Sequence, residues 1–261
     1  MQEKWQCRIA PSLGGGFEGH PNKVWGTKDY TNDQEPAVFF GLYGLPDFYT
    51  LWKHKGKKAI LWAGTDILHF KNGYWLEDGA HGIKLDPKPL AEWINKHCDN
   101  YCENHREQAT LKNHGIDAKV VPSFLGDVNA FTPQHIDPKE RFYSSVSGDD
   151  FDLYGWQIIN DLATTRREVE FHLYGNTAPW EAPKNVIVHG RVPKDQMNEE
   201  TKSMTGAIRM TRFDGCSELI VKSVLWGQKP LSLIHYPFLD AENPREELLK
   251  IINKYPWNEK I

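Results

Sequence analysis

Residues 209–232 read RMTRFDGCSELIVKSVLWGQKPLS, and their pattern is typical of a parallel β-sheet protein. The apolar residues that lead into this stretch predict a buried strand over 206–210, and residues 217–226 predict a helix. Gly227 ends that helix, and a second apolar run over 230–234 follows at once. A strand, a helix and another strand in this order favour a right-handed βαβ unit.

The same alternation extends along the rest of the chain. Short apolar or β-branched runs predict further strands over residues 6–10, 37–42, 58–63, 100–103, 118–122, 142–146, 170–174 and 185–189. Amphipathic patterns predict helices over residues 47–54, 87–97, 106–114, 154–165 and 244–254. Continuous apolar runs separated by amphipathic helices are typical of parallel strands that are covered on both faces. We therefore expect an α/β fold with doubly wound sheets.

One polar segment divides the chain. Residues 126–140 are rich in turn-forming residues and contain two prolines, which is typical of a linker. We predict an N-terminal α/β domain over 1–132 and a second α/β domain over 133–240. Residues 241–261 contain a final helix that can pack on either domain, including back on the first. A chain of 261 residues is long enough for two modest domains.

Composition and charge exclude several classes of protein. Aromatic residues make up 12% of the chain and include ten Trp, which excludes a disordered chain because such chains lack the side chains for a core. The net charge of −4 leaves no basic surplus for non-specific nucleic-acid binding. The chain has no run of about 18 apolar residues and no apolar signal core at its N-terminus. We expect a soluble, cytoplasmic protein with no transmembrane segment.

The four cysteines favour neither a disulfide scaffold nor a metal site. Four cysteines in 261 residues are too few to stabilise a fold of this size by disulfides. Cys98 and Cys102 have His97 and His105 nearby, but no second pair of matching spacing follows them. We therefore expect buried thiols, no metal and no cofactor.

A run of three glycines follows the first predicted strand. Gly14, Gly15 and Gly16 permit positive φ angles and let the backbone approach a ligand closely. The run stands where open α/β sheets bind ligands, but it matches neither a dinucleotide-binding motif nor a phosphate-binding P-loop. An ordinary flexible turn explains it equally well.

Three more residues stand at the ends of predicted strands. Asp66 follows the third strand, where a carboxylate can either take a proton from a substrate hydroxyl or cap the next helix. Gly148 and Gly155 flank the start of the helix predicted over 154–165. Backbone N–H groups at such a helix start make a natural seat for phosphate.

The richest group of charges lies in the stretch quoted first. Arg209, Arg212 and Asp214 come together where a strand ends, directly before a helix. Glu218 lies in the first turn of that helix and Lys222 lies one turn later. An exposed ion pair between Glu218 and Lys222, which would stabilise the helix by about 0.3–0.5 kcal/mol, is enough to explain these two residues. It does not explain why two arginines and Asp214 lie beside them.

This stretch resembles the donor-binding segment of the GT-B glycosyltransferases, a family in which a strand leads to an acid and a glycine, then a helix, then Gly-x-x-Pro before another strand. The matching residues here are Asp214 and Gly215, the helix over 217–226, and Gly227 with Pro230. Other loose matches follow in the family's order, at residues 14–16, 102–122, 170–175 and 186–193.

The resemblance implies two Rossmann-like domains that face a cleft and a metal-independent transfer of a sugar from a nucleotide-sugar to a hydroxyl acceptor. It places the donor on the second domain, with candidate contacts at Gly148, Gly155, Arg191, Arg209, Arg212, Asp214, Gly215, Ser217, Glu218 and Lys222. Cationic side chains and helix N-termini would stabilise the charge that develops on the leaving diphosphate. For a base we expect Asp66 first and His20 second. Glycan, lipid-linked, protein and modified nucleic-acid acceptors all fit.

The sequence also departs from the family. The usual pair of acids eight residues apart appears here as Asp214 and Lys222, so the second acid is either missing or replaced by Glu218. The histidine that many members carry after the second strand has no clear match. Two alternatives therefore stay open: a non-catalytic sugar- or nucleotide-binding protein of the same fold, and a different two-domain α/β enzyme that acts on nucleotide-sugars, such as an epimerase.

Overall fold

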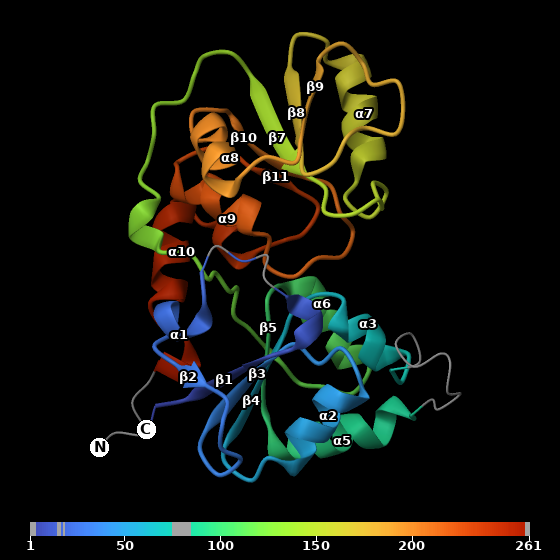
Figure 1. Ribbon diagram of the computed structural model, residues 1–261, viewed down its shortest axis with the longest axis vertical. Helices are drawn as coiled ribbons and strands as arrows, with labels where there is room; N and C mark the ends of the chain where they lie inside the picture. Colours follow the sequence, from blue (N-terminus) through green and yellow to red (C-terminus); the bar gives the residue numbers. More distant parts are fainter. Residues whose placement is uncertain (1–3, 15–16, 18, 75–84, 259–261) are drawn as a thin grey trace. The chain divides into compact units, whose positions relative to one another are not determined.

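The computed structural model describes residues 4–14, 17, 19–74 and 85–258. It divides into two compact units (Figure 1). Unit 1 comprises Met1–Asp127, Asp214–Cys216 and His235–Ile261, and unit 2 comprises Val128–Phe213 and Ser217–Ile234. The chain therefore leaves unit 2 for three residues, returns to it, and leaves it again before the C-terminal segment.

Unit 1 is built on a six-stranded parallel sheet with the order β2-β1-β3-β4-β5-β6. Its strands are β1 (Gln6–Ile9), β2 (Lys28–Asp29), β3 (Ala37–Phe40), β4 (Lys58–Trp62), β5 (Asp99–Cys102) and β6 (Lys119–Val120). Its described helices are η1 (Pro11–Leu13), α1 (Pro21–Val24), α2 (Leu45–Lys53), α3 (Asp66–Lys71), α5 (Pro87–His97), α6 (His105–Asn113), η3 (Pro237–Asp240), α10 (Pro244–Ile252) and η4 (Pro256–Asn258).

Unit 2 has a five-stranded parallel sheet with the order β11-β10-β7-β8-β9. Its strands are β7 (Arg141–Ser145), β8 (Glu170–Tyr174), β9 (Val186–Gly190), β10 (Gly206–Arg209) and β11 (Leu231–Ser232). Its helices are η2 (Val128–Ala130), α7 (Trp156–Thr165), α8 (Lys194–Thr201) and α9 (Glu218–Leu225). The chain runs from β7 outward to β8 and β9 and then returns to the other side of β7, so the topological switch point lies between β7 and β10.

Both sheets are buried in the way their apolar runs predict. All residues of β3, and Ala59 to Trp62 in β4, are at most 2% exposed. In unit 2, Trp156 and Ile159 of α7 pack with Phe171 and Leu173 of β8 in one core cluster. The prediction of an α/β fold with doubly wound parallel sheets is confirmed.

Predicted and observed elements agree closely, apart from several short elements. The predicted strands and helices lie within two residues of the observed ones, and Asp86 and Asn243 cap α5 and α10 by accepting hydrogen bonds from backbone N–H groups. The two-residue strand β2, the helices α1, α3 and α8, and the short 3-10 helices η1 to η4 were not predicted. Helix α8 reads KDQMNEET, so it has no apolar stripe to reveal it.

The units differ from the predicted domain boundaries in two places. The change at Asp127 falls inside the linker predicted over 126–140. Residues 214–216, however, belong to unit 1 although they stand in the middle of the predicted second domain. Residues 235–240 also lie in unit 1, together with the final helix. Long-range packing, which no local pattern records, decides these assignments.

The C-terminal segment completes the core of unit 1. The Trp25 ring lies 4.9 Å from the Trp257 ring and 5.6 Å from the Tyr255 ring, centroid to centroid. The Tyr255 hydroxyl also accepts a hydrogen bond from the Phe124 backbone N–H at 2.9 Å. Among the described residues, no helix has both the length and the apolar composition required to cross a membrane.

Candidate functional site

The carboxyl edge of the unit 2 sheet at the switch point brings together several of the predicted residues. In open α/β sheets, ligands bind where neighbouring loops diverge at such a point. Here the loop over 146–155 follows β7 and the loop over 210–213 follows β10. The two loops touch where Gly155 approaches the Met210 carbonyl group, and the edge above them is the position at which an open α/β sheet binds a ligand.

Two glycines shape the first of these loops. Gly155 is the N-cap of α7 with φ +75°, and a Cβ at this position would overlap the backbone carbonyl group of Met210, just beyond β10. Gly148 has φ +89° and open space around it. The Asn176 side chain donates to the Gly148 carbonyl at 2.6 Å and so ties this loop to the end of β8. Both positions require a residue that tolerates positive φ.

Arg209 supplies a fixed positive charge at the same edge. It is the last residue of β10, and its Nη1 donates to the Ser145 carbonyl of β7 at 3.1 Å. Its guanidinium carbon lies 4.3 Å from the centre of the Tyr154 ring, and the Tyr154 hydroxyl bonds to Ser147. A held guanidinium beside the N-terminus of α7 favours an anion, because both carry positive charge.

The other predicted cations do not gather there. Arg191 is exposed and follows β9, which lies three strand spacings, about 14 Å, from β10. Arg212 is exposed three residues beyond the end of β10. Lys222 is only 5% exposed, and its Nζ donates to Asn198 Oδ1 of α8 at 3.0 Å, so it packs between two helices.

The predicted acid–glycine turn lies in unit 1, where it is held by its backbone. The Asp214 carbonyl accepts from Asn104 Nδ2 at 2.9 Å, and the Gly215 carbonyl accepts from the Tyr236 hydroxyl at 2.8 Å. The Cys216 N–H donates to Glu103 Oε2 at 2.7 Å. A Cβ at Gly215 would overlap that same carboxylate, so the turn needs glycine.

Ser217 and Glu218 stand directly after this turn, at the start of α9 in unit 2. Ser217 is the N-cap residue, but its side chain makes no capping hydrogen bond, and it is 7% exposed. Glu218 is half-buried in the first helical turn. The segment predicted to bind a donor as one piece is therefore divided between the two units.

Asp66 is fully buried and carries structural hydrogen bonds. Its carboxylate accepts from the Leu42 N–H and the Ala63 N–H, both at 3.1 Å. Burial raises its pKa to about 7. A carboxylate with no exposed surface has no access to a substrate hydroxyl, so this position does not support the predicted role of Asp66 as a base.

Two buried glutamates that the sequence analysis did not single out lie near Asp66. The Glu103 carboxylate accepts from Ser123 as well as from Cys216, and Glu107 accepts from the Glu103 N–H at 2.7 Å. Burial raises the pKa of Glu103 to about 8, and burial together with the Glu103 charge raises that of Glu107 well above its usual range. Glu103 directly follows β5 and Glu107 lies in the first turn of α6, where acids are common, so no local pattern revealed that both are buried.

His20, the second predicted base, lies at the surface. It is the N-cap of α1, and its Nδ1 accepts from the Asn22 N–H at 3.3 Å. The remainder of its ring is exposed. Gly14 ends η1 in a turn, and Gly15 and Gly16 lie outside the described residues.

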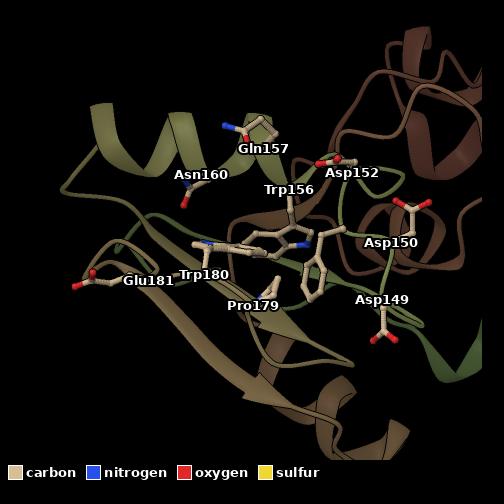
Figure 2. A pocket seen from close by; sticks show the side chains of 10 residues that line it. Asp149, Asp150, Asp152, Trp156, Gln157, Asn160, Pro179, Trp180 and Glu181 are labelled. Atoms are coloured by element: carbon tan, nitrogen blue, oxygen red, sulfur yellow. The ribbon is translucent and has the colours of Figure 1, made fainter.

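The loop after β7 also borders a pocket of about 510 Å³ in unit 2 (Figure 2). Helix α7 and the segment over 179–181 form its other walls. Its side chains are aromatic and acidic, in contrast to the cationic switch point.

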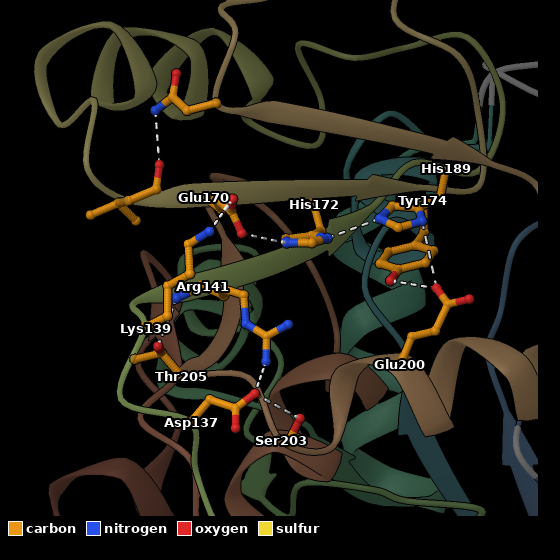
Figure 3. Close-up of polar contacts among 12 residues, drawn as sticks. Asp137, Lys139, Arg141, Glu170, His172, Tyr174, His189, Glu200, Ser203 and Thr205 are labelled. Atoms are coloured by element: carbon orange, nitrogen blue, oxygen red, sulfur yellow. Dashed lines mark hydrogen bonds and ion pairs between the residues drawn. The ribbon is translucent and has the colours of Figure 1, made fainter.

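A histidine pair forms a further titratable cluster within unit 2 (Figure 3). His172 Nδ1 and His189 Nε2 lie 2.9 Å apart, so one donates to the other. The His189 ring stacks on Tyr174, whose hydroxyl donates to Glu200 at 2.8 Å. Burial, together with the neighbouring histidine, lowers the pKa of His172 to about 4. His172 lies in the middle of β8, Tyr174 is the last residue of that strand, His189 is the last but one of β9, and Glu200 belongs to α8.

In the described part of the chain, no group of three or more His, Cys, Asp or Glu side chains is arranged to hold a metal ion. The four cysteines are free thiols, and Cys7 and Cys102 are buried. Burial raises the pKa of Cys98 to about 12, which makes this thiol a poor metal ligand at neutral pH.

Comparison with solved structures settles the fold. TarM superposes with a TM-score of 0.55 at 13% identity, over 87% of this chain and 49% of its own. The S. aureus TarM variant solved with fondaparinux, α-GlcNAc-glycerol and UDP superposes with a TM-score of 0.53 at 12% identity, over 87% of this chain and 50% of its own. HepE from Anabaena, solved with UDP and glucose, superposes with a TM-score of 0.52 at 11% identity, over 83% of this chain and 67% of its own.

The chain has the GT-B fold. The expectation drawn from the order of its motifs is thereby confirmed at the level of fold. This GT-B chain spans about half the length of TarM. No protein-family model matches it, and no curated protein matches it in sequence.

Proposed function

We propose that this chain transfers a sugar from a nucleotide-sugar donor to a hydroxyl acceptor without the help of a metal. The observation that carries the proposal is Arg209, which is held against Tyr154 and Ser145 at the switch point of unit 2 beside the N-terminus of α7. The structural neighbours TarM and HepE were solved with UDP, which supports a nucleoside diphosphate at this type of fold.

The proposed reaction breaks the bond between the anomeric carbon and the diphosphate and forms a bond to the acceptor oxygen. Negative charge develops on the leaving diphosphate, and a positioned guanidinium with helix N–H groups stabilises such charge. Gly148 and Gly155 provide the positive-φ turns of this loop, and a Cβ at Gly148 would have no atom within 4 Å. His20 is the remaining candidate base, since its ring is exposed whereas Asp66 is buried.

Replacement of Arg209 by alanine tests the proposal. A charge-assisted hydrogen bond contributes about 1.5–3 kcal/mol, so we expect the Kd for the donor to rise about 10- to 100-fold. Calorimetry with UDP-glucose, UDP-GlcNAc and GDP-mannose would identify the donor and measure the change. Arg209→Lys keeps the charge but loses the planar stack on Tyr154, and we expect an intermediate affinity.

Arg166→Ala is the matched control for Arg209. Arg166 is an exposed arginine of unit 2 that pairs with Glu168 and Glu140. We expect its loss to leave the donor Kd unchanged. Equal affinities in Arg209→Ala and Arg166→Ala would show that the diphosphate does not bind at the switch point.

Sugar transfer must be distinguished from binding of the nucleotide-sugar alone, because a protein of the same fold can bind the donor without catalysing its reaction. Release of UDP from UDP-sugar in the presence of purified protein, measured by a coupled assay, reports turnover. Donor binding without any turnover, in the absence and in the presence of acceptors, would favour the non-catalytic alternative. That alternative rests on Lys222, which replaces the family's second acid and is buried against α8.

Glu218 is proposed to supply the hydrogen bonds to the ribose or sugar that the missing acid would make. We expect Glu218→Ala to raise the donor Kd about tenfold or more, because a charged hydrogen bond to the ligand is lost. Asp195→Ala is the control, since Asp195 is likewise an acid in the first turn of a unit 2 helix but is exposed. A small stability loss of similar size in both variants, with unchanged donor affinity, would show that Glu218 only complements the helix dipole.

A further inference from the structure

The pocket beside α7 has an aromatic wall (Figure 2). The Phe151 and Trp180 rings meet at 88° with their centres 5.0 Å apart, and the Trp156 ring lies 6.0 Å from Trp180. A volume of about 510 Å³ is within the range of about 300–1,000 Å³ that small-molecule ligands use. Flat apolar faces of this kind pack against flat apolar faces of a ligand.

Three polar atoms around this pocket are buried without a partner in the described residues. They are Nε1 of Trp156, Nε1 of Trp180 and Oδ1 of Asn160. Trp156 is 1% exposed, and Figure 2 shows its indole nitrogen on the side of the pocket where Asp150 and Asp152 lie. A buried polar group with no hydrogen bond costs about 1–3 kcal/mol, and a ligand hydroxyl that reaches the Trp156 or Trp180 nitrogen would recover part of that cost.

The charge of the pocket limits what this ligand can be. Four carboxylates line it, from Asp149, Asp150, Asp152 and Glu181, and no Lys or Arg is among the lining residues. Asp149 accepts from Asn176 at 3.0 Å and Asp150 from the Leu153 N–H at 2.9 Å, so these two carboxylates also shape their loop. Each carboxylate retains further lone pairs. An anionic diphosphate is therefore repelled here, in contrast to the switch point beside Arg209.

We propose that this pocket binds a pyranose residue of a neutral or amino-substituted glycan, as a second site separate from the donor site. Sugar hydroxyls can donate to the carboxylates and also accept from the indole N–H groups, while a C–H face of the ring packs on Trp180. A simple organic cation would satisfy the carboxylates but leave both indole donors unpaired. Hydroxyl groups satisfy both kinds of atom, which is why a sugar fits better.

Titration with four methyl pyranosides tests the site: the α- and β-glucosides, the β-galactoside and the β-N-acetylglucosaminide. Calorimetry and tryptophan fluorescence of the full chain report binding. We expect at least one to bind saturably, with an affinity at least tenfold weaker in Trp180→Ala and a few-fold weaker in Asp152→Asn. Trp52→Ala is the matched control, because Trp52 is a 55% exposed tryptophan of unit 1. Thermal melting of each variant confirms that it folds.

Several outcomes would overturn the inference. These are no binding by any of the four glycosides, equal affinity in Trp180→Ala and Trp52→Ala, or binding of tetramethylammonium in place of the glycosides. Competition between UDP and the glycoside would show that the pocket belongs to the donor site. UDP-sugar binding lost in Arg209→Ala but kept in Trp180→Ala leaves the proposed function standing whatever the glycosides do, so the two proposals fail separately.

Discussion

Gly155→Ala is expected to destabilise the protein by about 2–6 kcal/mol, whereas Gly148→Ala costs only about 1–3 kcal/mol. Both glycines have positive φ, at +75° and +89°, which costs a side-chain-bearing residue about 1–3 kcal/mol. At Gly155 the new Cβ would also overlap the Met210 carbonyl group, and overpacking adds about 1–3 kcal/mol. At Gly148 no atom lies within 4 Å of the new Cβ, so no such addition arises.

Urea denaturation of both variants measures the difference. A loss of this size is a large part of the 5–15 kcal/mol that usually stabilises a folded domain, so Gly155→Ala should shift the midpoint strongly. Because Gly155 opens α7 next to Arg209, the same variant should also weaken donor binding in the fraction that folds. Equal losses of stability in the two variants would show that the loops after β7 and β10 do not approach as closely as the structure has them.

Stability is expected to fall by about 3 kcal/mol between pH 6.5 and 8.5 because buried carboxyl groups must ionise. The pKa is about 7 for Asp66 and about 8 for Glu103 in the folded protein, far above the usual range. The unfolded chain has already released these protons at pH 6.5, while the folded chain still holds most of them. A folded state that binds more protons loses stability as the pH rises, and each pH unit costs up to about 1.4 kcal/mol per proton. Glu107 acts in the same direction.

Other titratable groups contribute to the pH dependence of stability mainly outside this window. The lowered pKa of His172, about 4, makes stability fall as the pH drops below the unfolded value near 6.5, which is the opposite sign. Above about pH 8.5, the buried thiols begin to add their own loss, because unfolded cysteines ionise there. Between these limits the buried carboxyl groups dominate.

Glu107→Gln isolates the carboxyl cluster. Glu107 Oε1 is buried with no hydrogen-bond partner in the described residues, so a neutral amide removes the ionisable group without breaking a hydrogen bond to that oxygen. We expect this variant to be more stable than the wild type at pH 8.5 and to show a flatter pH profile. Glu246→Gln, an exposed glutamate that pairs with Lys250, should leave the profile unchanged. An unchanged slope in Glu107→Gln would mean that Glu107 ionises at its usual pH.

The turn at residues 214–216 contacts the buried carboxyl group of Glu103 and directly precedes the helix that carries Glu218, a proposed donor contact. Its Cys216 N–H bonds to the Glu103 carboxylate, and it stands directly before the start of α9. Protonation of Glu103 weakens a charge-assisted hydrogen bond to that turn. The donor affinity of the wild type is therefore worth measuring at both ends of the same pH range.

The sequence by itself determined the elements and the class of fold. Apolar runs such as those of β3 and β4 predict buried strands because a strand covered on both faces has no polar side. Caps such as Asp86 mark helix starts because their side chains bond to backbone N–H groups that are close in sequence. Gly148, Gly155 and Arg209 were identified as site candidates for the same reason: each stands at a strand end or helix start that a local pattern reveals.

Only the tertiary structure decided which of the candidates meet. The strand order β10-β7-β8-β9 brings Arg209 beside the loop after β7 and separates it from Arg191 after β9. The buried bond between Glu103 and Cys216 joins residues 113 positions apart and places the acid–glycine turn in unit 1. Burial likewise gave Asp66 and Lys222 structural partners in place of solvent. Such contacts depend on how whole sheets and helices pack, and a pattern that spans one element carries no information about its distant neighbours.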